Sequence, residues 1–225
     1  MTLALSAFLL TSELCLLSLL SRKLTQSLYV LFFRIFRNKT VSMTILVILL
    51  FPGTVVHELA HLFVAEVLRV RTGKLTLVPE GLEDTEIKAG GVMIAQTDPL
   101  RRTLIGLAPV YVGIAVLAAL SYFLSQNITV INVIPIIIFY IIFAVSNSMF
   151  SSKEDMKGVI PFAITVGLFA AAAYFAGFRV GLTGELLEKI LSLIQTLVRS
   201  LGIVLAVNLI GLILASMLLG VIQKR

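Results

Sequence analysis

The stretch from Val41 to Val70 constrains the fold of this chain more than any other part of the sequence. It is long and apolar enough to cross a lipid bilayer, since about 20 predominantly apolar residues suffice in a helix. Within it lie His57, Glu58 and His61, in the pattern H-E-x-x-H. Residues four apart lie one turn apart on the same face of a helix, so both imidazoles can reach one metal ion.

The position of this motif inside an apolar helix also indicates function. Ionisable side chains within a membrane span are costly and mark a functional site. Glu58 can take a proton from water at the metal. The alternative is that His57 and His61, the only two histidines, are structural. We give that alternative less weight, because a chance match has a probability on the order of 1% or less and polar groups in lipid need partners.

The composition is that of an all-α polytopic membrane protein. Of 225 residues, 59% are hydrophobic and 13% are charged, and the mean hydropathy is +1.06. No soluble class has this composition, and no polar stretch is long enough for a second domain, so residues 1–225 form one integral-membrane domain. The net charge of +6 suits loops that meet lipid headgroups better than nucleic acid. Cys15 stands alone, so there is no cysteine metal site. We expect a multi-pass protein of the cell membrane.

Hydropathy predicts about six transmembrane helices. They are Leu3–Leu20, Val41–Leu68, Thr103–Leu124, Ile128–Ser146, Val159–Phe178 and Leu201–Ile222. Ser21–Thr40 carries five basic residues, and we expect an interfacial or re-entrant helix there. Gly181–Arg199 is amphipathic and lies along the interface or leads directly into the last span. Pro52 and Gly53, one turn before His57, predict a kink.

Arg69–Arg102 is the only sizeable polar segment. Its β-prone sequences KLTLVPE and TEIKAGGVMIAQ flank a turn at Gly81–Asp84. They predict a membrane-associated β-hairpin or small sheet directly after the motif helix. Gly90 and Gly91 mark a bend, a bulge or a close backbone approach.

The expected metal is zinc, one ion per chain, because imidazole and carboxylate suit it. A catalytic zinc needs three protein ligands plus water, so one ligand is missing. Glu66 lies on the wrong face of the helix that carries the motif. Asp155 comes from a separate span that ends on the same side of the membrane. The acids of the polar segment are further candidates: Glu80, Glu83, Asp84, Glu86 and Asp98.

From about Val41 to Gly158 the chain resembles the site-2 protease family of intramembrane zinc metalloproteases. His57, Glu58 and His61 match the family's first motif. The second motif is Asn-x-x-Pro-x-Pro-x-Leu-Asp-Gly, and Asn147 and Asp155 stand at its Asn-to-Asp spacing. Its other fixed positions differ here and hold Phe150, Ser152, Glu154 and Met156. The chain is similar to a compact or divergent member without a PDZ domain.

The resemblance implies hydrolysis of a peptide bond in or near a transmembrane segment of a membrane-protein or peptide substrate. It assigns the third zinc ligand to Asp155 and the general base to Glu58. Asn147 would hold the substrate backbone or the oxyanion, although a helix C-cap is an equally good interpretation. Ala89 to Val92 is similar to the family's glycine pair in a sheet, which places Gly90 and Gly91 beside the substrate.

Two other classes of function remain open. The first is a metal-binding membrane scaffold or chaperone of the same fold that does not cut, which the altered second motif favours. The second is a metal transporter, against which stands the lack of a second set of intramembrane acids along a path. Glu58 favours the protease, because metal binding alone does not require it.

Overall fold

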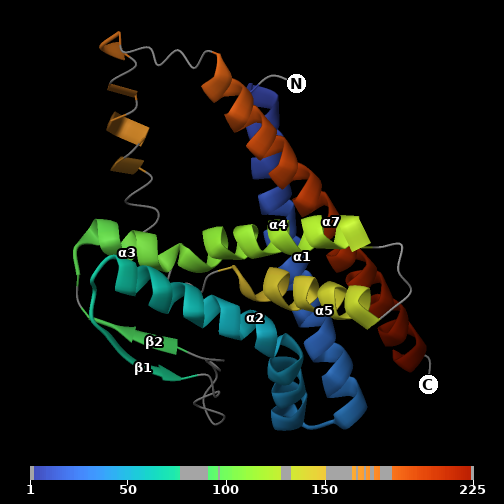
Figure 1. Ribbon diagram of the computed structural model, residues 1–225. Coiled ribbons are helices and arrows are strands. Elements are labelled where there is room, and N and C mark those ends of the chain that lie inside the picture. The colour runs from blue at the N-terminus through green and yellow to red at the C-terminus, as the bar shows by residue number, and fades with distance from the viewer. Residues whose placement is uncertain are drawn as a thin grey trace.

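The computed structural model describes residues 3–76, 91–95, 97–127, 133–150, 164–165, 167–169, 171–172, 175–177 and 184–223. The chain is mainly helical over these residues (Figure 1). In order, the elements are α1 (Leu3–Phe36), α2 (Lys39–Val67), β1 (Thr72–Thr76), β2 (Gly91–Ile94), α3 (Pro99–Gly106), α4 (Ala108–Asn127), α5 (Val133–Ser148) and α7 (Glu185–Gln223).

Four helical stretches among the described residues are long and apolar enough to cross a membrane. They are Leu5–Phe36, Lys39–Val67, Pro99–Leu124 and Glu185–Ile222, and α5 is a shorter apolar helix. This agrees with the predicted class, a helical membrane protein. Most of the span expected at Val159–Phe178 lies outside the described residues. The count of six spans therefore stays a prediction.

The first helix differs from the prediction. α1 continues through 34 residues to Phe36, so the separate interfacial helix expected at Ser21–Thr40 is wrong. The physical reason is that α1 contains no glycine or proline to interrupt it. It ends where Arg37 adopts a left-handed φ of 52° and where Asn38 caps α2, its Oδ1 accepting from the Val41 N–H at 3.1 Å. In α7, the amphipathic segment runs directly into the last span, as one of the two alternatives predicted.

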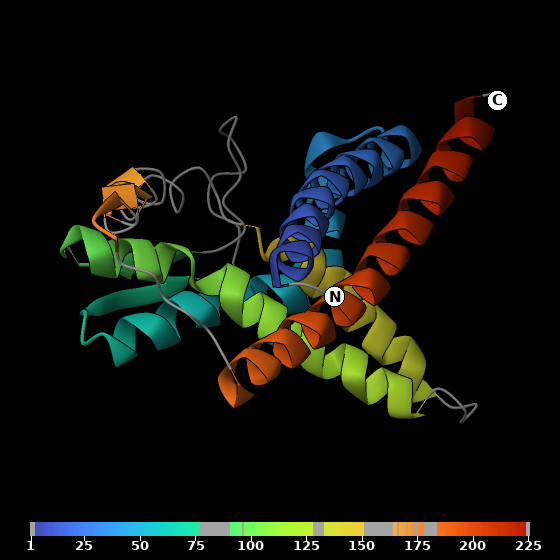
Figure 2. The same cartoon turned by 90° about the horizontal axis from the view of Figure 1, so that it is seen from above.

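The helix α5 lies at the centre of the bundle. It contacts α1, α2, α4 and α7, and α1 also packs along α7 (Figures 1 and 2). The main apolar core joins α1, α4, α5 and α7, with Leu17, Leu117, Ile142 and Leu201 fully or almost fully buried. A second apolar cluster packs the end of α2 against α3 and the start of α4: Ala60, Val64, Ala65, Val70, Ile105 and Ala108.

The strands β1 and β2 form a two-stranded antiparallel sheet in which Thr76 pairs with Gly91. The sheet contacts α2, and Figure 2 shows it together with α3, far from the C-terminal end of α7. The predicted turn at Gly81–Asp84 and the glycine Gly90 lie outside the described residues. The pairing follows the predicted sheet, and the hairpin connection stays a prediction.

Figure 1 shows that α2 changes direction part way along its length, and Pro52 is the proline inside this helix. A proline removes one hydrogen bond from the helix and frees carbonyl groups nearby. Tyr140 of α5 donates its hydroxyl to the Leu49 carbonyl at 3.1 Å, so α5 supports the bend. At Gly53, α5 comes so close that an added Cβ would overlap the Ala144 carbonyl and lie 2.6 Å from Ser148 Oγ.

This close approach gives a stability prediction. Gly53→Ala should destabilise the bundle by about 1–3 kcal/mol, the usual cost of overpacking. Gly220 on α7 is the matched control, because a Cβ there meets nothing within 4 Å. We expect Gly220→Ala to keep or slightly raise the thermal midpoint of the detergent-solubilised protein. Equal midpoints for both variants would contradict the tight α2–α5 packing.

Candidate metal centre

The two histidines of the motif lie one turn apart on α2 and their rings meet at their edges. The ring centroids are 4.9 Å apart and the ring planes are inclined by 78°. The Nε2 atoms of His57 and His61 approach to 3.2 Å. The i, i+4 spacing therefore brings the two imidazoles together on one face of α2.

Each ring is fixed from its other side by a backbone carbonyl. His57 Nδ1 lies 2.7 Å from the Ser148 carbonyl at the end of α5, and His61 Nδ1 lies 2.8 Å from the Ile105 carbonyl in α3. A carbonyl oxygen can only accept, so both Nδ1 atoms carry the hydrogen. In neutral rings both Nε2 atoms then present lone pairs to each other. Two lone pairs at this distance repel unless a proton or a metal ion lies between them.

The separation of the Nε2 atoms fits one zinc ion. Two tetrahedral ligands with Zn–N bonds of about 2.0–2.1 Å lie about 3.3–3.4 Å apart, close to the 3.2 Å observed. Metal-binding histidines almost always donate their second ring N–H to a carbonyl, a carboxylate or water. Both histidines have such a partner before any metal is considered. The residues present therefore fit the implied zinc.

The motif faces the interior of the bundle. Glu58 is 7% exposed and His61 is 5% exposed, while Leu59 on the outer face is 44% exposed. A buried carboxylate and two imidazoles on one apolar helix need polar surroundings, because lipid offers no hydrogen bonds. Glu58 is therefore buried, and His57 beside it in the chain is half-buried.

The structure does not identify a third ligand. In that part of the chain, no group of three His, Cys, Asp or Glu side chains is arranged to hold a metal ion. Glu66 is exposed, as expected for the wrong face of α2. Asp155 lies outside the described residues, and so do Glu80, Glu83, Asp84 and Glu86. Asp155 therefore stays a prediction.

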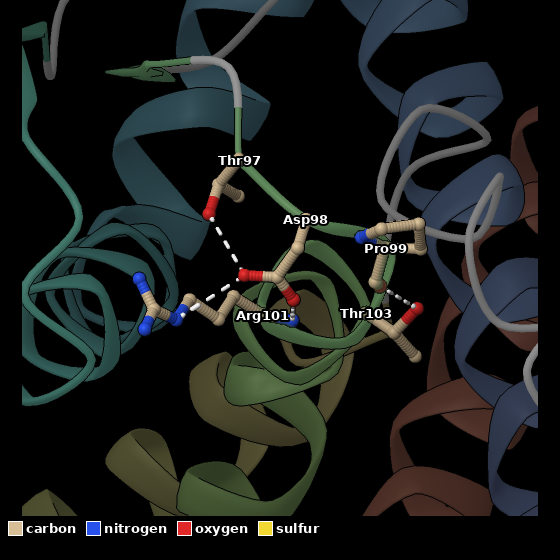
Figure 3. A network of polar contacts seen from close by, with 5 residues as sticks. All are labelled: Thr97, Asp98, Pro99, Arg101 and Thr103. Carbon is tan, nitrogen blue, oxygen red and sulfur yellow. Dashed lines mark hydrogen bonds and ion pairs between the residues drawn. The ribbon is translucent and has the colours of Figure 1, made fainter.

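Asp98, another candidate ligand, caps a helix. It is the N-cap of α3, and its Oδ1 accepts from the Arg101 N–H at 2.9 Å. Its Oδ2 forms an ion pair with Arg101 Nε at 3.2 Å and accepts from Thr97 Oγ1 at 3.5 Å (Figure 3). The hydrogen bond from the Arg101 backbone N–H is the main reason why the pKa of Asp98 lies below its usual value. A carboxylate engaged in this way on the surface needs no metal to explain it.

Asn147 is held by its own helix α5 and by α1 and α7. Its amide Nδ2 donates to the Phe143 carbonyl at 2.8 Å and to Asn208 Oδ1 at 2.6 Å. Its backbone carbonyl accepts from Ser21 Oγ at 3.4 Å. Its Oδ1 is buried and has no hydrogen-bond partner among the described residues. Both amide hydrogens of Asn147 are therefore engaged, which leaves the side chain no donor for an oxyanion.

Sequence reasoning missed the two carbonyls that orient the histidines. Every residue has a carbonyl, so no side-chain pattern could single out Ser148 or Ile105. Gly53 was the one available signal, because a glycine on a packed helix face permits close backbone approach. From the sequence, Gly53 was taken only as part of the kink in α2.

Of the predicted glycine pair Gly90 and Gly91, the structure describes Gly91, which begins β2.

Comparison of this chain with family models, with curated proteins and with solved structures gives no match in any of the three. The resemblance to the site-2 proteases therefore depends on the motif residues alone.

The role of Asp98 as a cap predicts that Asp98→Ala keeps the full zinc content but lowers the thermal midpoint at neutral pH. Because the pKa of Asp98 is lowered in the folded protein, its stabilising effect is present above the unfolded pKa of about 3.9 and is lost as pH falls through the folded value. The difference between variant and wild type should shrink in acid.

Asp98→Asn is the matched control, since asparagine also caps helices and removes only the charge. Its thermal midpoint should fall less than that of Asp98→Ala. Loss of zinc from either variant would restore Asp98 as a candidate ligand.

Proposed function

We propose that the protein is an intramembrane zinc metalloprotease that hydrolyses a peptide bond in or near a transmembrane segment of a membrane-protein substrate. One observation carries the proposal. Two imidazoles on an apolar helix turn their Nε2 atoms toward each other at 3.2 Å while carbonyls hold both Nδ1 atoms, and a buried glutamate follows the first of them.

His57 and His61 would hold the zinc, with Asp155 as the third ligand. A zinc ion there polarises the scissile carbonyl and lowers the pKa of water. Glu58 takes a proton from the attacking water as the C–O bond forms, and it donates that proton to the leaving amide nitrogen as the C–N bond breaks. Asn147 accepts a backbone N–H of the substrate through Oδ1. The proposal places the protein in the membrane as a multi-pass enzyme.

The substrate would reach the metal as an extended segment. The amides of a helix are bonded to one another and covered by side chains, so a transmembrane helix must unwind before it is cut. The sheet of β1 and β2 contacts α2, and an extended peptide can add to such a sheet as a further strand. We propose that Gly91, at the start of β2, and Gly90, which precedes it in the sequence, lie beside it.

Replacing Glu58 with glutamine should stop cleavage and leave zinc bound, because glutamine has a similar shape but cannot accept the proton. Removal of a general base typically slows a reaction by roughly 10²–10⁴-fold. Cleavage is followed by immunoblotting of single-span model substrates co-expressed with the enzyme, and zinc by mass spectrometry of the purified protein. A variant that cuts at the wild-type rate would exclude Glu58 as the base. A wild-type protein that binds zinc but cuts no substrate would favour the alternative function, a metal-binding membrane scaffold or chaperone that does not cut.

Asp155→Ala should lose both zinc and cleavage. Loss of a direct ligand should weaken zinc binding by more than the roughly 10–100-fold typical of outer-shell partners. Asp84→Ala is the control, since Asp84 belongs to the polar segment after the motif helix. If Asp155→Ala keeps zinc and activity while Asp84→Ala loses them, the third ligand is Asp84 and the match to the second motif is accidental.

A further inference from the structure

A fully buried asparagine on α7, Asn208, connects that helix to the end of α5. Its Nδ2 donates to Ser146 Oγ at 2.7 Å and to the Val204 carbonyl at 3.0 Å. Its Oδ1 accepts from Asn147 Nδ2 at 2.6 Å. The side chain thus uses both of its N–H groups and its oxygen in the buried interior of the bundle.

The two partners of Asn208 on α5 directly precede Ser148, whose carbonyl holds His57. On the α4 side, Met149 packs so closely against Gly113 that an added Cβ would lie 2.8 Å from Met149 Cβ. The last turn of α5 is therefore fixed by α7 through Asn208 and by α4 through Met149. The contacts of Asn208 and Met149 together therefore determine where the Ser148 carbonyl meets His57 on α2.

We propose that Asn208 is a positioning residue for His57. By holding Ser146 and Asn147 it fixes the Ser148 carbonyl, which keeps the hydrogen of His57 on Nδ1. Without that acceptor the hydrogen can move to Nε2, where it blocks the atom that faces His61. The consequence for zinc rests on the proposed function, but the position of the hydrogen on the ring does not.

The chain offers a direct measurement of this effect. Because it has only two histidines, the ¹⁵N spectrum of tag-free protein labelled at its imidazole nitrogens contains signals from those two alone. The metal-free protein is examined well above the ordinary imidazole pKa of about 6.5. His61 is an internal control, since its Nδ1 hydrogen is held by the Ile105 carbonyl in α3 and not by α5.

Two variants test the inference, Asn208→Leu and the milder Ser146→Ala. In both, the His57 signals should shift toward the tautomer with hydrogen on Nε2, while the His61 signals keep the hydrogen on Nδ1. Zinc affinity, measured by competition with a chelator, should fall on the order of 10-fold. Ser121→Ala is the matched control. Ser121 is equally buried, but its hydroxyl donates to the Ser200 carbonyl of α7 at 3.4 Å and not to α5.

The outcomes distinguish the positioning role of Asn208 from the proposed protease function. If Asn208→Leu does not fold, Ser146→Ala decides. A folded Ser146→Ala protein with wild-type His57 signals would overturn the positioning role even if zinc binds to the histidines. The same result in folded Asn208→Leu would also overturn it. A change confined to His57 supports the positioning role even if the wild-type protein binds no zinc, in which case only the proposed function fails.

Discussion

The close approach of α5 to α2 at Gly53 is the contact on which the rest of the site depends. The absence of a side chain at Gly53 leaves room for the backbone of α5, with Ala144 and Ser148 occupying the space that a Cβ would need. In a membrane, helices associate through such close packing, because lipid supplies no hydrophobic force between them. The same approach brings the Ser148 carbonyl to 2.7 Å from His57 Nδ1. A bulkier residue at position 53 would move the acceptor that orients the histidine.

The candidate metal centre is thus built by three segments that are distant in the sequence. α2 supplies both rings, α5 orients His57 and α3 orients His61, with separations of 91 and 44 residues. The orienting groups are backbone carbonyls, which keep their hydrogen-bonding character whatever side chain is present. Two neutral rings oriented in this way face each other with lone pairs, an arrangement that a cation stabilises. The separation of the two Nε2 atoms fits one metal ion, and under the proposed function Glu58 is the general base beside it.

How much the sequence could predict depends on how local each feature is. The pairing of His57 with His61 needs only helical geometry, so the motif was sufficient. Helix continuity is also local, and α1 was divided wrongly because five basic residues in Ser21–Thr40 were given more weight than the lack of any glycine or proline. Asn208 lies in an apolar span and gives no sign of its partners, since Ser146 and Asn147 are about 60 residues away. Contacts of this kind appear only when the helices are placed together.

The arrangement of α2 separates an exposed outer face from the face that carries the motif. Phe63 and Val67 on its outer face are 64% and 65% exposed, while the motif faces inward. α5 contacts His57 on one side and α3 contacts His61 on the other through the two carbonyls. Under the proposed function, a substrate helix would have to unwind before it is cut, because its amides are bonded to one another.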